Sequence, residues 1–120
     1  MAGLGELESR VMAALWDAHG PRTVRAVHTT LTGERELAYT TVMTVLDNLH
    51  GKGWVRRERE GRAWVYTPAR LREEAGAQML RDVLNSLGDP QGVLLHFARA
   101  MDERESEFLR RALSRDGDRP

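Results

Sequence analysis

The segment from Ala38 to Gly53 constrains the fold of this chain more than any other stretch. Its aliphatic side chains recur at positions i, i+3, i+4 and i+7: Val42, Val45, Leu46 and Leu49. This spacing predicts a helix over residues 38–50 with one apolar stripe that packs into a core. Because successive helical residues are about 100° apart, Thr40, Thr44 and Asp47 point away from the stripe.

The outward side of this predicted helix is short, polar and mostly uncharged, with Thr41, Met43 and Asn48 on its flanks. Solvated helix faces are more often filled with lysine and glutamate. Short side chains allow another surface to come close, and the groove of DNA is one candidate. Two interpretations stay open from this segment alone: a half-buried helix with a threonine-rich surface, or a helix that binds DNA.

Length and composition limit the class of protein. The 120 residues allow one domain, or one small domain with a helical extension. The absence of cysteine excludes disulfides, thiolate zinc sites and cysteine nucleophiles. It also fits a reducing cytosol, and we expect a cytoplasmic protein. We expect no signal peptide and no membrane association, because the first residues lack a basic start and no apolar run reaches the roughly 20 residues of a membrane span.

The net charge of zero counts mildly against nucleic-acid binding, but the basic residues are unevenly distributed. Against Glu58 and Glu60, the segment 52–62 carries five basic residues: Lys52, Arg56, Arg57, Arg59 and Arg62. Such a patch can bind phosphates, or it can be a solvated hairpin. Because a free carboxylate would repel phosphate, we expect Asp47 to pair with a basic neighbour or to contact a cytosine amino group.

Two amphipathic helices precede the segment. Apolar spacing predicts the first over about residues 4–19. Thr23 is the expected N-cap of the second, because its hydroxyl can accept an unpaired N–H of the first turn. After a polar turn over 32–36, we expect Leu37 to pack inward and Gly51 to end the third helix in the left-handed conformation.

Short β-prone segments at 54–59 and 63–67 follow the third helix, joined by a tight turn at residues 60–62 and stopped by Pro68. The order of three helices and a hairpin predicts a winged helix. The fold class is therefore mainly α with a small β-hairpin: a winged helix-turn-helix followed by a C-terminal helical dimerisation region. Arg62 at the wing tip is a candidate for the DNA backbone or minor groove.

The helical period returns after Arg70. We place a winged-helix DNA-binding domain at 1–69 and a helical dimerisation domain at 70–120, with a frayed tail from Arg115. The last helices carry more apolar surface than about 50 residues can bury alone. We therefore favour a second copy of the chain as their cover over helices folded back on the winged helix. The candidate dimerisation residues are Leu80, Val83, Leu84, Leu87, Val93, Leu94, Phe97, Met101, Phe108, Leu109 and Leu113.

Five motifs carry a family resemblance: Glu8-x-x-Val11-Met12-x-x-x-Trp16, Val24-Arg25-x-Val27-His28-x-x-Leu31, the run from Ala38 to Leu49, Lys52-Gly53, and Gly61-Arg62-Ala63-x-x-Tyr66-x-Pro68. At these spacings the chain resembles the penicillinase-repressor family of winged-helix transcriptional regulators, of the BlaI, MecI and CopY type. The resemblance covers the winged helix almost entirely and continues more loosely to about Leu113.

The resemblance implies a homodimeric bacterial repressor that binds inverted repeats in promoters, often with TACA and TGTA half-sites. It implies that Thr40, Thr41 and Thr44 face DNA and that Gly61-Arg62 is the wing. Many relatives carry a lysine at the position of Met43 and an arginine at that of Asn48. The face is less charged here, so we expect shape and close fit to contribute more to DNA recognition than charge.

Regulation in the family takes two forms. Members with an antibiotic-sensing partner are inactivated by proteolysis, often at an Asn-Phe bond, and the corresponding position here is His96-Phe97. Relief of repression by a regulatory protease is therefore an expectation, although the bond differs. Copper-responsive relatives carry a C-terminal cysteine cluster, which this chain lacks, so a thiolate copper sensor is excluded.

Together these features predict a sequence-specific repressor with double-stranded DNA and a second copy of itself as partners. The candidate DNA-binding residues are Thr23, Tyr39, Thr40, Thr41, Thr44, Asn48, Lys52, Arg56 and Arg62. We expect no enzyme, cofactor or metal, because no acid–base pair or metal-ligand spacing is visible. The alternative is a winged-helix protein-interaction module that does not bind DNA. An acidic or apolar face over helix 38–50 would favour this alternative.

Overall fold

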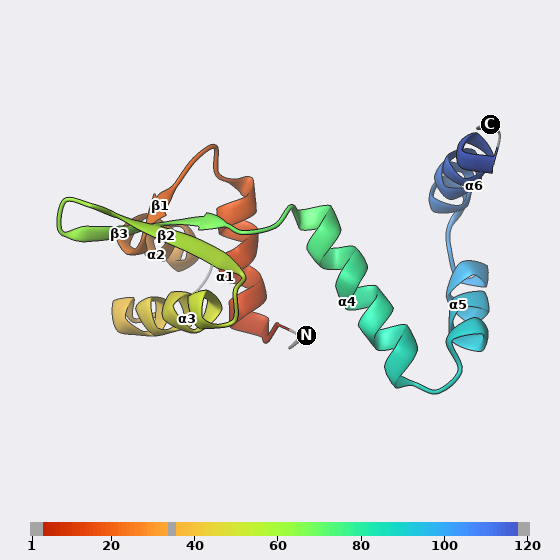
Figure 1. The fold of residues 1–120 in the computed structure, drawn as a ribbon, viewed down its shortest axis with the longest axis horizontal. Coiled ribbons are helices and arrows are strands. Elements are labelled where there is room, and N and C mark those ends of the chain that lie inside the picture. Colours follow the sequence, from red (N-terminus) through yellow and green to blue (C-terminus); the bar gives the residue numbers. More distant parts are fainter. Residues whose placement is uncertain (1–3, 34–35, 118–120) are drawn as a thin grey trace. The chain divides into compact units, whose positions relative to one another are not determined.

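The computed structural model describes residues 4–33 and 36–117, with side chains described as far as Ser114. Glu34 and Arg35 of the predicted polar turn lie outside the described residues. The predicted order of three helices, a hairpin and further helices is confirmed (Figure 1). The elements are α1 (Glu6–Asp17), β1 (Arg22–Thr23), α2 (Val24–Thr32), α3 (Tyr39–Gly51), β2 (Val55–Glu60), β3 (Ala63–Pro68), α4 (Arg72–Ser86), α5 (Pro90–Arg99) and α6 (Glu103–Gly117).

The predicted hairpin belongs to a three-stranded antiparallel sheet with the strand order β1-β3-β2. Glu60 pairs with Ala63 at the hairpin's tip, so Gly61 and Arg62 form the turn. Gly61 has a φ of 66°, in the left-handed region that favours glycine. The sequence did not predict β1, because a two-residue strand has no alternating pattern to recognise.

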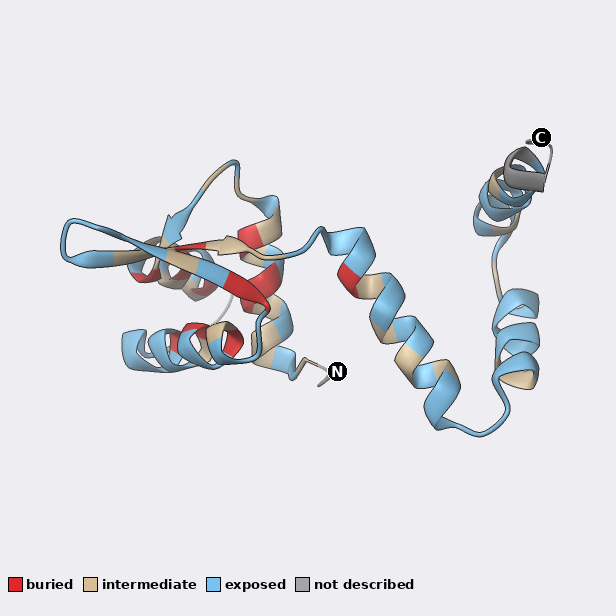
Figure 2. Ribbon diagram, viewed as in Figure 1, coloured by how far each residue is buried: buried red, intermediate tan, exposed pale blue. Residues whose placement is uncertain are grey.

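One hydrophobic core joins the three helices, the sheet and the first turn of α4 (Figure 2). Val42, Leu46 and Leu49 of the predicted stripe are fully buried, and Val45 and Leu37 pack against the core. The third helix therefore has the orientation that its sequence predicted. The buried core residues are Val11, Met12, Leu15, Val24, Val27, Leu31, Val42, Leu46, Leu49, Trp54, Val55, Tyr66 and Ala75.

Of the two predicted helix caps, the one at the start of α2 is correct and the one at the end of α3 is wrong. Thr23 caps α2 as predicted, since its Oγ1 accepts a hydrogen bond from the Ala26 N–H at 3.1 Å. Gly51 is not the left-handed cap of α3, because it is the last residue of the helix. That role belongs to Gly53, with a φ of 81°.

The end of α3 is a Schellman motif built around Gly53. The Gly53 N–H donates to the His50 carbonyl oxygen at 3.1 Å, and the Trp54 N–H donates to that of Leu49 at 2.9 Å. Trp54, directly after the glycine, is buried in the core. The motif therefore ends the helix, reverses the chain and leads straight into β2.

The start of α4 is fastened to the winged helix. Trp16 Nε1 donates to the Arg70 carbonyl oxygen at 3.0 Å, and Ala75 in the first turns of α4 is fully buried. The chain forms two compact units that divide after Met79, within α4. The division of function between residues 1–69 and 70–120 stays a prediction.

The second unit holds the end of α4, α5 and α6. Asp89 caps α5 by accepting a hydrogen bond from the Gly92 N–H at 3.0 Å. Residues 115–117 of the tail that we expected to be frayed belong to α6, and residues 118–120 lie outside the described residues. Among the described helices, none combines the length and apolar character needed to cross a membrane.

The apolar side chains of this unit are mostly exposed, and α5 has no buried residue (Figure 2). Of the candidate dimerisation residues, Leu84, Val93 and Met101 are half-buried. Leu95, which was not among the candidates, is also exposed. The exposed large apolar residues of the unit are Leu80, Val83, Leu87, Leu94, Leu95, Phe97, Phe108, Leu109 and Leu113.

Candidate nucleic-acid interface

The outer face of α3 is fully available to a partner. Every residue that the sequence placed on this face or its flanks is exposed: Thr40, Thr41, Met43, Thr44, Asp47 and Asn48. Tyr39, in the first turn of the helix, is exposed as well. Threonine hydroxyls and an asparagine amide can donate to phosphates or to base edges. The tip of the hairpin and the N-terminal end of α3 lie at the same end of the winged helix (Figure 1).

A groove of about 420 Å³ lies between the first turns of α3 and the wing. Three of the residues predicted to bind DNA, Thr23, Tyr39 and Arg62, line it together although they are far apart in sequence. The other lining residues are Val24, Arg25, Met43, Ala63, Trp64 and Tyr66. The arrangement brings one helix N-terminus, one helix flank and the wing tip to a common site.

Two arginines give this groove its charge. Arg25 and Arg62 are both exposed, and within the described part of the chain neither forms an ion pair. Sequence reasoning missed Arg25. Its position could have identified it, because it lies in the first turn of α2, two residues after the Thr23 cap, where side chains surround unpaired backbone N–H groups.

The wing is stiffened by arginines stacked on an indole. The guanidinium carbons of Arg57 and Arg59 lie 4.4 and 4.7 Å from the centroid of the Trp64 ring. Arg59 also donates to the Arg62 carbonyl oxygen at 3.3 Å, across the turn. Cation–π contacts of this kind hold flat, charged side chains against the strand. The wing tip therefore presents Arg62 from an ordered hairpin.

The predicted pairing of Asp47 with a basic neighbour is present in the structure. Arg57 Nη1 lies 3.0 Å from Asp47 Oδ1, and this ion pair joins β2 to α3. The pKa of Arg57 is raised, first by its hydrogen bond to Tyr66 and then by Asp47, so the guanidinium stays charged. The carboxylate on the outer face of α3 is thus paired within the protein.

His28 positions the start of α3, a role that the sequence did not indicate. Its Nε2 lies 2.7 Å from the Leu37 carbonyl oxygen. Because a carbonyl can only accept, Nε2 carries the proton and donates it. The His28 ring also meets the Tyr39 ring edge to face, at a centroid distance of 5.7 Å. These contacts hold Tyr39 at the mouth of the groove.

Two of the predicted DNA-binding residues lie neither in this groove nor on the outer face of α3. Lys52 Nζ is held by both carboxylate oxygens of Glu8 on α1, at 2.8 and 3.0 Å. Arg56 follows Val55 on β2 and points to the face opposite Arg57, because side chains alternate along a strand.

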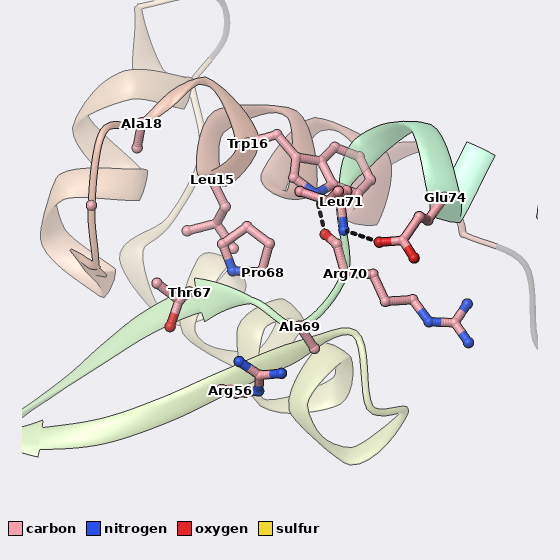
Figure 3. Close-up of a pocket in the computed structure, with 11 residues that line it drawn as sticks. Leu15, Trp16, Ala18, Arg56, Thr67, Pro68, Ala69, Arg70, Leu71 and Glu74 are labelled. Carbon is pink, nitrogen blue, oxygen red and sulfur yellow. Dashed lines mark hydrogen bonds between the residues drawn. The ribbon is translucent and has the colours of Figure 1, made fainter. Parts of the chain in front are cut away.

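Arg56 lines a second groove, of about 430 Å³, between the end of α1, the end of β3 and the start of α4 (Figure 3). Leu15, Trp16, Pro68 and Leu71 supply its apolar part. Figure 3 shows the hydrogen bonds at its rim, from Trp16 to the Arg70 carbonyl and from the Leu71 N–H to Glu74. The contacts around this groove hold the start of α4 against the winged helix. None of its lining residues lines the groove beside α3.

Within the described residues, no group of histidine and carboxylate side chains is arranged to hold a metal ion.

The candidate interface consists of the outer face of α3, the groove with Arg25 and Arg62, and the wing. These parts can contact phosphates and base edges, which is the chemistry of nucleic-acid recognition.

A family model and several known proteins match this chain. The model described as penicillinase repressor matches residues 4–115. The transcriptional regulator BlaI of Mycobacterium tuberculosis is 44% identical over 114 residues, which cover 92% of this chain and 83% of that relative.

Two solved structures resemble the winged helix. The solution structure of the DNA-binding domain of the repressor BlaI is 28% identical and covers 59% of this chain and 85% of its own, with a TM-score of 0.53. The solution structure of monomeric Bacillus licheniformis BlaI in complex with the blaP half-operator is 27% identical. It covers 61% of this chain and 88% of its own, with a TM-score of 0.51.

The Glu8–Lys52 pair predicts a pH-dependent stability. The pKa of the Glu8 carboxyl is lowered from its usual value of 4.5. The main cause is the hydrogen bond that it accepts from the Gly5 N–H, and the second is its hydrogen bond with the Lys52 ammonium. A lowered pKa stabilises the fold above pH 4.5, and this stabilisation is lost as the pH falls through the lowered value. Glu8→Gln removes the charge but keeps an oxygen that can accept the Gly5 N–H, so we expect it to cost about 0.5 kcal/mol at neutral pH, the usual size of a partly exposed ion pair.

Urea unfolding followed by circular dichroism, at neutral pH and at several values below 4.5, measures this difference. The gap between the native chain and Glu8→Gln should shrink as the pH falls. Glu6→Gln is the matched control, because it lies in the same turn of α1 and leaves the Lys52 pair intact. A gap that stays constant down to acidic pH would show that the charge of Glu8 contributes nothing.

Proposed function

The chain belongs to the penicillinase repressor family, and we propose that it is a sequence-specific DNA-binding transcriptional repressor acting as a homodimer. The observation that carries the proposal is the groove in which Thr23, Arg25, Tyr39 and Arg62 converge beside the exposed face of α3. A relative with the same winged helix is solved in complex with its half-operator, which supports DNA as the partner.

In this proposal α3 enters the major groove of DNA. Thr40, Thr41 and Thr44 lie on its outer face and donate hydroxyl hydrogens to base edges or phosphates, and Asn48 contacts the backbone. The DNA backbone that borders the major groove lies in the groove of the protein between α3 and the wing. There Arg25 and Arg62 neutralise phosphates from two sides.

We propose other roles for two of the predicted DNA-binding residues, on the basis of their contacts and positions. Lys52 donates to both carboxylate oxygens of Glu8, so we propose that it orders the end of α3 and does not primarily bind phosphate. Arg56 lies on the other face of the sheet, away from the groove. We replace both with Arg25 as the stronger phosphate contact.

The proposed dimer rests on the exposed apolar faces of α4, α5 and α6. An isolated chain would leave Leu94 and Phe97 of α5 and Phe108 of α6 in water, which is costly for large apolar groups. A second copy covers such a surface with matching side chains. A two-fold dimer also matches two half-sites of an inverted repeat, which the resemblance implies to be of the TACA and TGTA type.

The alternative of a protein-interaction module that does not bind DNA called for an acidic or apolar face over helix 38–50. The face carries threonines and an asparagine, its one carboxylate is paired with Arg57, and Arg25 and Arg62 flank it. We therefore propose DNA as the ligand. Since its target is chromosomal DNA, we place its action in the bacterial cytoplasm, with no catalytic activity and no cofactor.

Operator binding is tested by selecting DNA from a random-sequence pool with the full chain. We expect enrichment of inverted repeats with TACA and TGTA half-sites, and affinity that falls steeply with salt as counterions are released. Because both copies in the dimer lose a contact, Arg62→Ala should weaken binding to every enriched sequence by about 2 kcal/mol, roughly thirtyfold, and lower the salt slope by about two.

Arg81→Ala is the matched control, since Arg81 is an exposed arginine of α4 outside the winged helix. Failure of the native chain to enrich any sequence would refute the proposed function. A loss in Arg62→Ala that is confined to one operator sequence would contradict a backbone contact.

Dimerisation is tested by placing a charge on the apolar face of α5. Phe97 is 54% exposed in the single chain, so Phe97→Asp leaves the fold intact but puts a carboxylate into the proposed interface. Sedimentation equilibrium should show a monomer for Phe97→Asp and a dimer for the native chain. Gln91→Asp, an exposed polar position on the same helix, should remain dimeric. A native chain with a monomer mass, or a dimeric Phe97→Asp, would contradict this interface.

We also propose a regulatory protease as a partner, on the support of the family resemblance. His96 and Phe97 are exposed but lie within α5, so the helix must open locally before a protease can bind the bond in extended form. Cleavage there would separate α6 from the winged helix. Intact-mass measurement of repressor recovered from cells with induced target promoters should show the fragment that ends near His96. Recovery of only the intact chain would argue against proteolysis.

A further inference from the structure

Met43 is an exposed apolar residue on a helix face that is otherwise polar. It is 44% exposed and lies one turn after Tyr39, and these two are the only exposed large apolar side chains of α3. Thr40 and Thr44 lie on either side of it along the outer face. Since burial of Met43 would gain free energy, its exposure in the free protein indicates a surface that is covered on binding.

Met43 lies where the outer face of α3 meets the groove beside the wing. Met43 lines the groove together with Ala63 and Trp64 of the wing, while Arg25 and Arg62 line the same space. The charged residues attract the DNA backbone to the groove. Met43 lies on α3 itself, which in the proposed complex is the element inside the major groove.

The major groove offers Met43 one apolar partner. The base edges there present hydrogen-bond donors and acceptors, with the 5-methyl group of thymine as the only apolar feature. Methionine is unbranched and its thioether is polarisable, so it adapts to a methyl group whose position varies slightly between half-sites. Threonine hydroxyls at positions 40 and 44 can reach the polar edges on either side.

We propose that Met43 reads the 5-methyl group of a thymine in each operator half-site, which makes it a specificity-determining residue. The inference rests on the proposed function, because it requires α3 to lie in the major groove. In this proposal, thymine is distinguished from other bases by an apolar contact with Met43. The family resemblance implies that many relatives carry a lysine at this position. Threonines and arginines then supply hydrogen bonds and charge around it.

Deoxyuridine substitution tests this contact, because it removes only the 5-methyl group and keeps the base pair. The probes are duplexes enriched from the random pool by the native chain, with each thymine replaced by deoxyuridine in turn. We expect at least one position per half-site to lose about fourfold in affinity, the value of burying one methyl group. For Met43→Ala, thymine and deoxyuridine at that position should bind equally.

Met43→Leu is the conservative control and should retain the preference for thymine, because it keeps an apolar side chain of similar size. Since Met43 is exposed and outside the core, the variants should unfold at the same urea concentration as the native chain. If no deoxyuridine weakens the native complex, or if Met43→Ala keeps the preference, the inference is wrong while the repressor function stands. If the native chain enriches no DNA, both are wrong.

Discussion

The left-handed turn at Gly53 is the constraint on which the candidate nucleic-acid interface depends. It ends α3 with two backbone hydrogen bonds and places Trp54 in the core directly afterwards. A residue with a Cβ would be strained at a φ of 81°. Because the chain reverses there within a few residues, β2 runs back beside α3 and brings Arg57 to Asp47. The wing then lies at the N-terminal end of the helix.

A neutral chain can present a basic surface where particular carboxylates are paired within the protein. Glu8 is taken up by Lys52 and the Gly5 N–H, and Asp47 by Arg57. Exposed ion pairs of this kind add little stability, commonly below 1 kcal/mol. Their larger effect is electrostatic: the Asp47–Arg57 pair removes negative potential from the outer face of α3, while Arg25 and Arg62 form no ion pair among the described residues. Net charge was therefore a poor guide to the ligand.

The sequence predicted the features that arise from local periodicity and missed those that depend on distant contacts. The stripe of α3, the Thr23 cap and the turn at Gly61 each follow from spacing or backbone chemistry within a few residues. Gly51 and Gly53 are both suitable caps, and only the burial of Trp54 decides between them. Arg56 and Arg25 likewise look equally basic in sequence, and the strand register and the groove separate their roles.

The winged helix closes its own core, which limits what the rest of the chain can change. The last fully buried core residue is Ala75, and the structure divides after Met79. Nothing in the core therefore depends on α5 or α6. In the proposed dimer, a change in those helices would alter how the two copies associate without altering the face of α3. The affinity of such a repressor for its operator would then depend on the free energy of dimerisation. Each winged helix binds its half-site weakly, and the two together bind strongly only when the dimer links them.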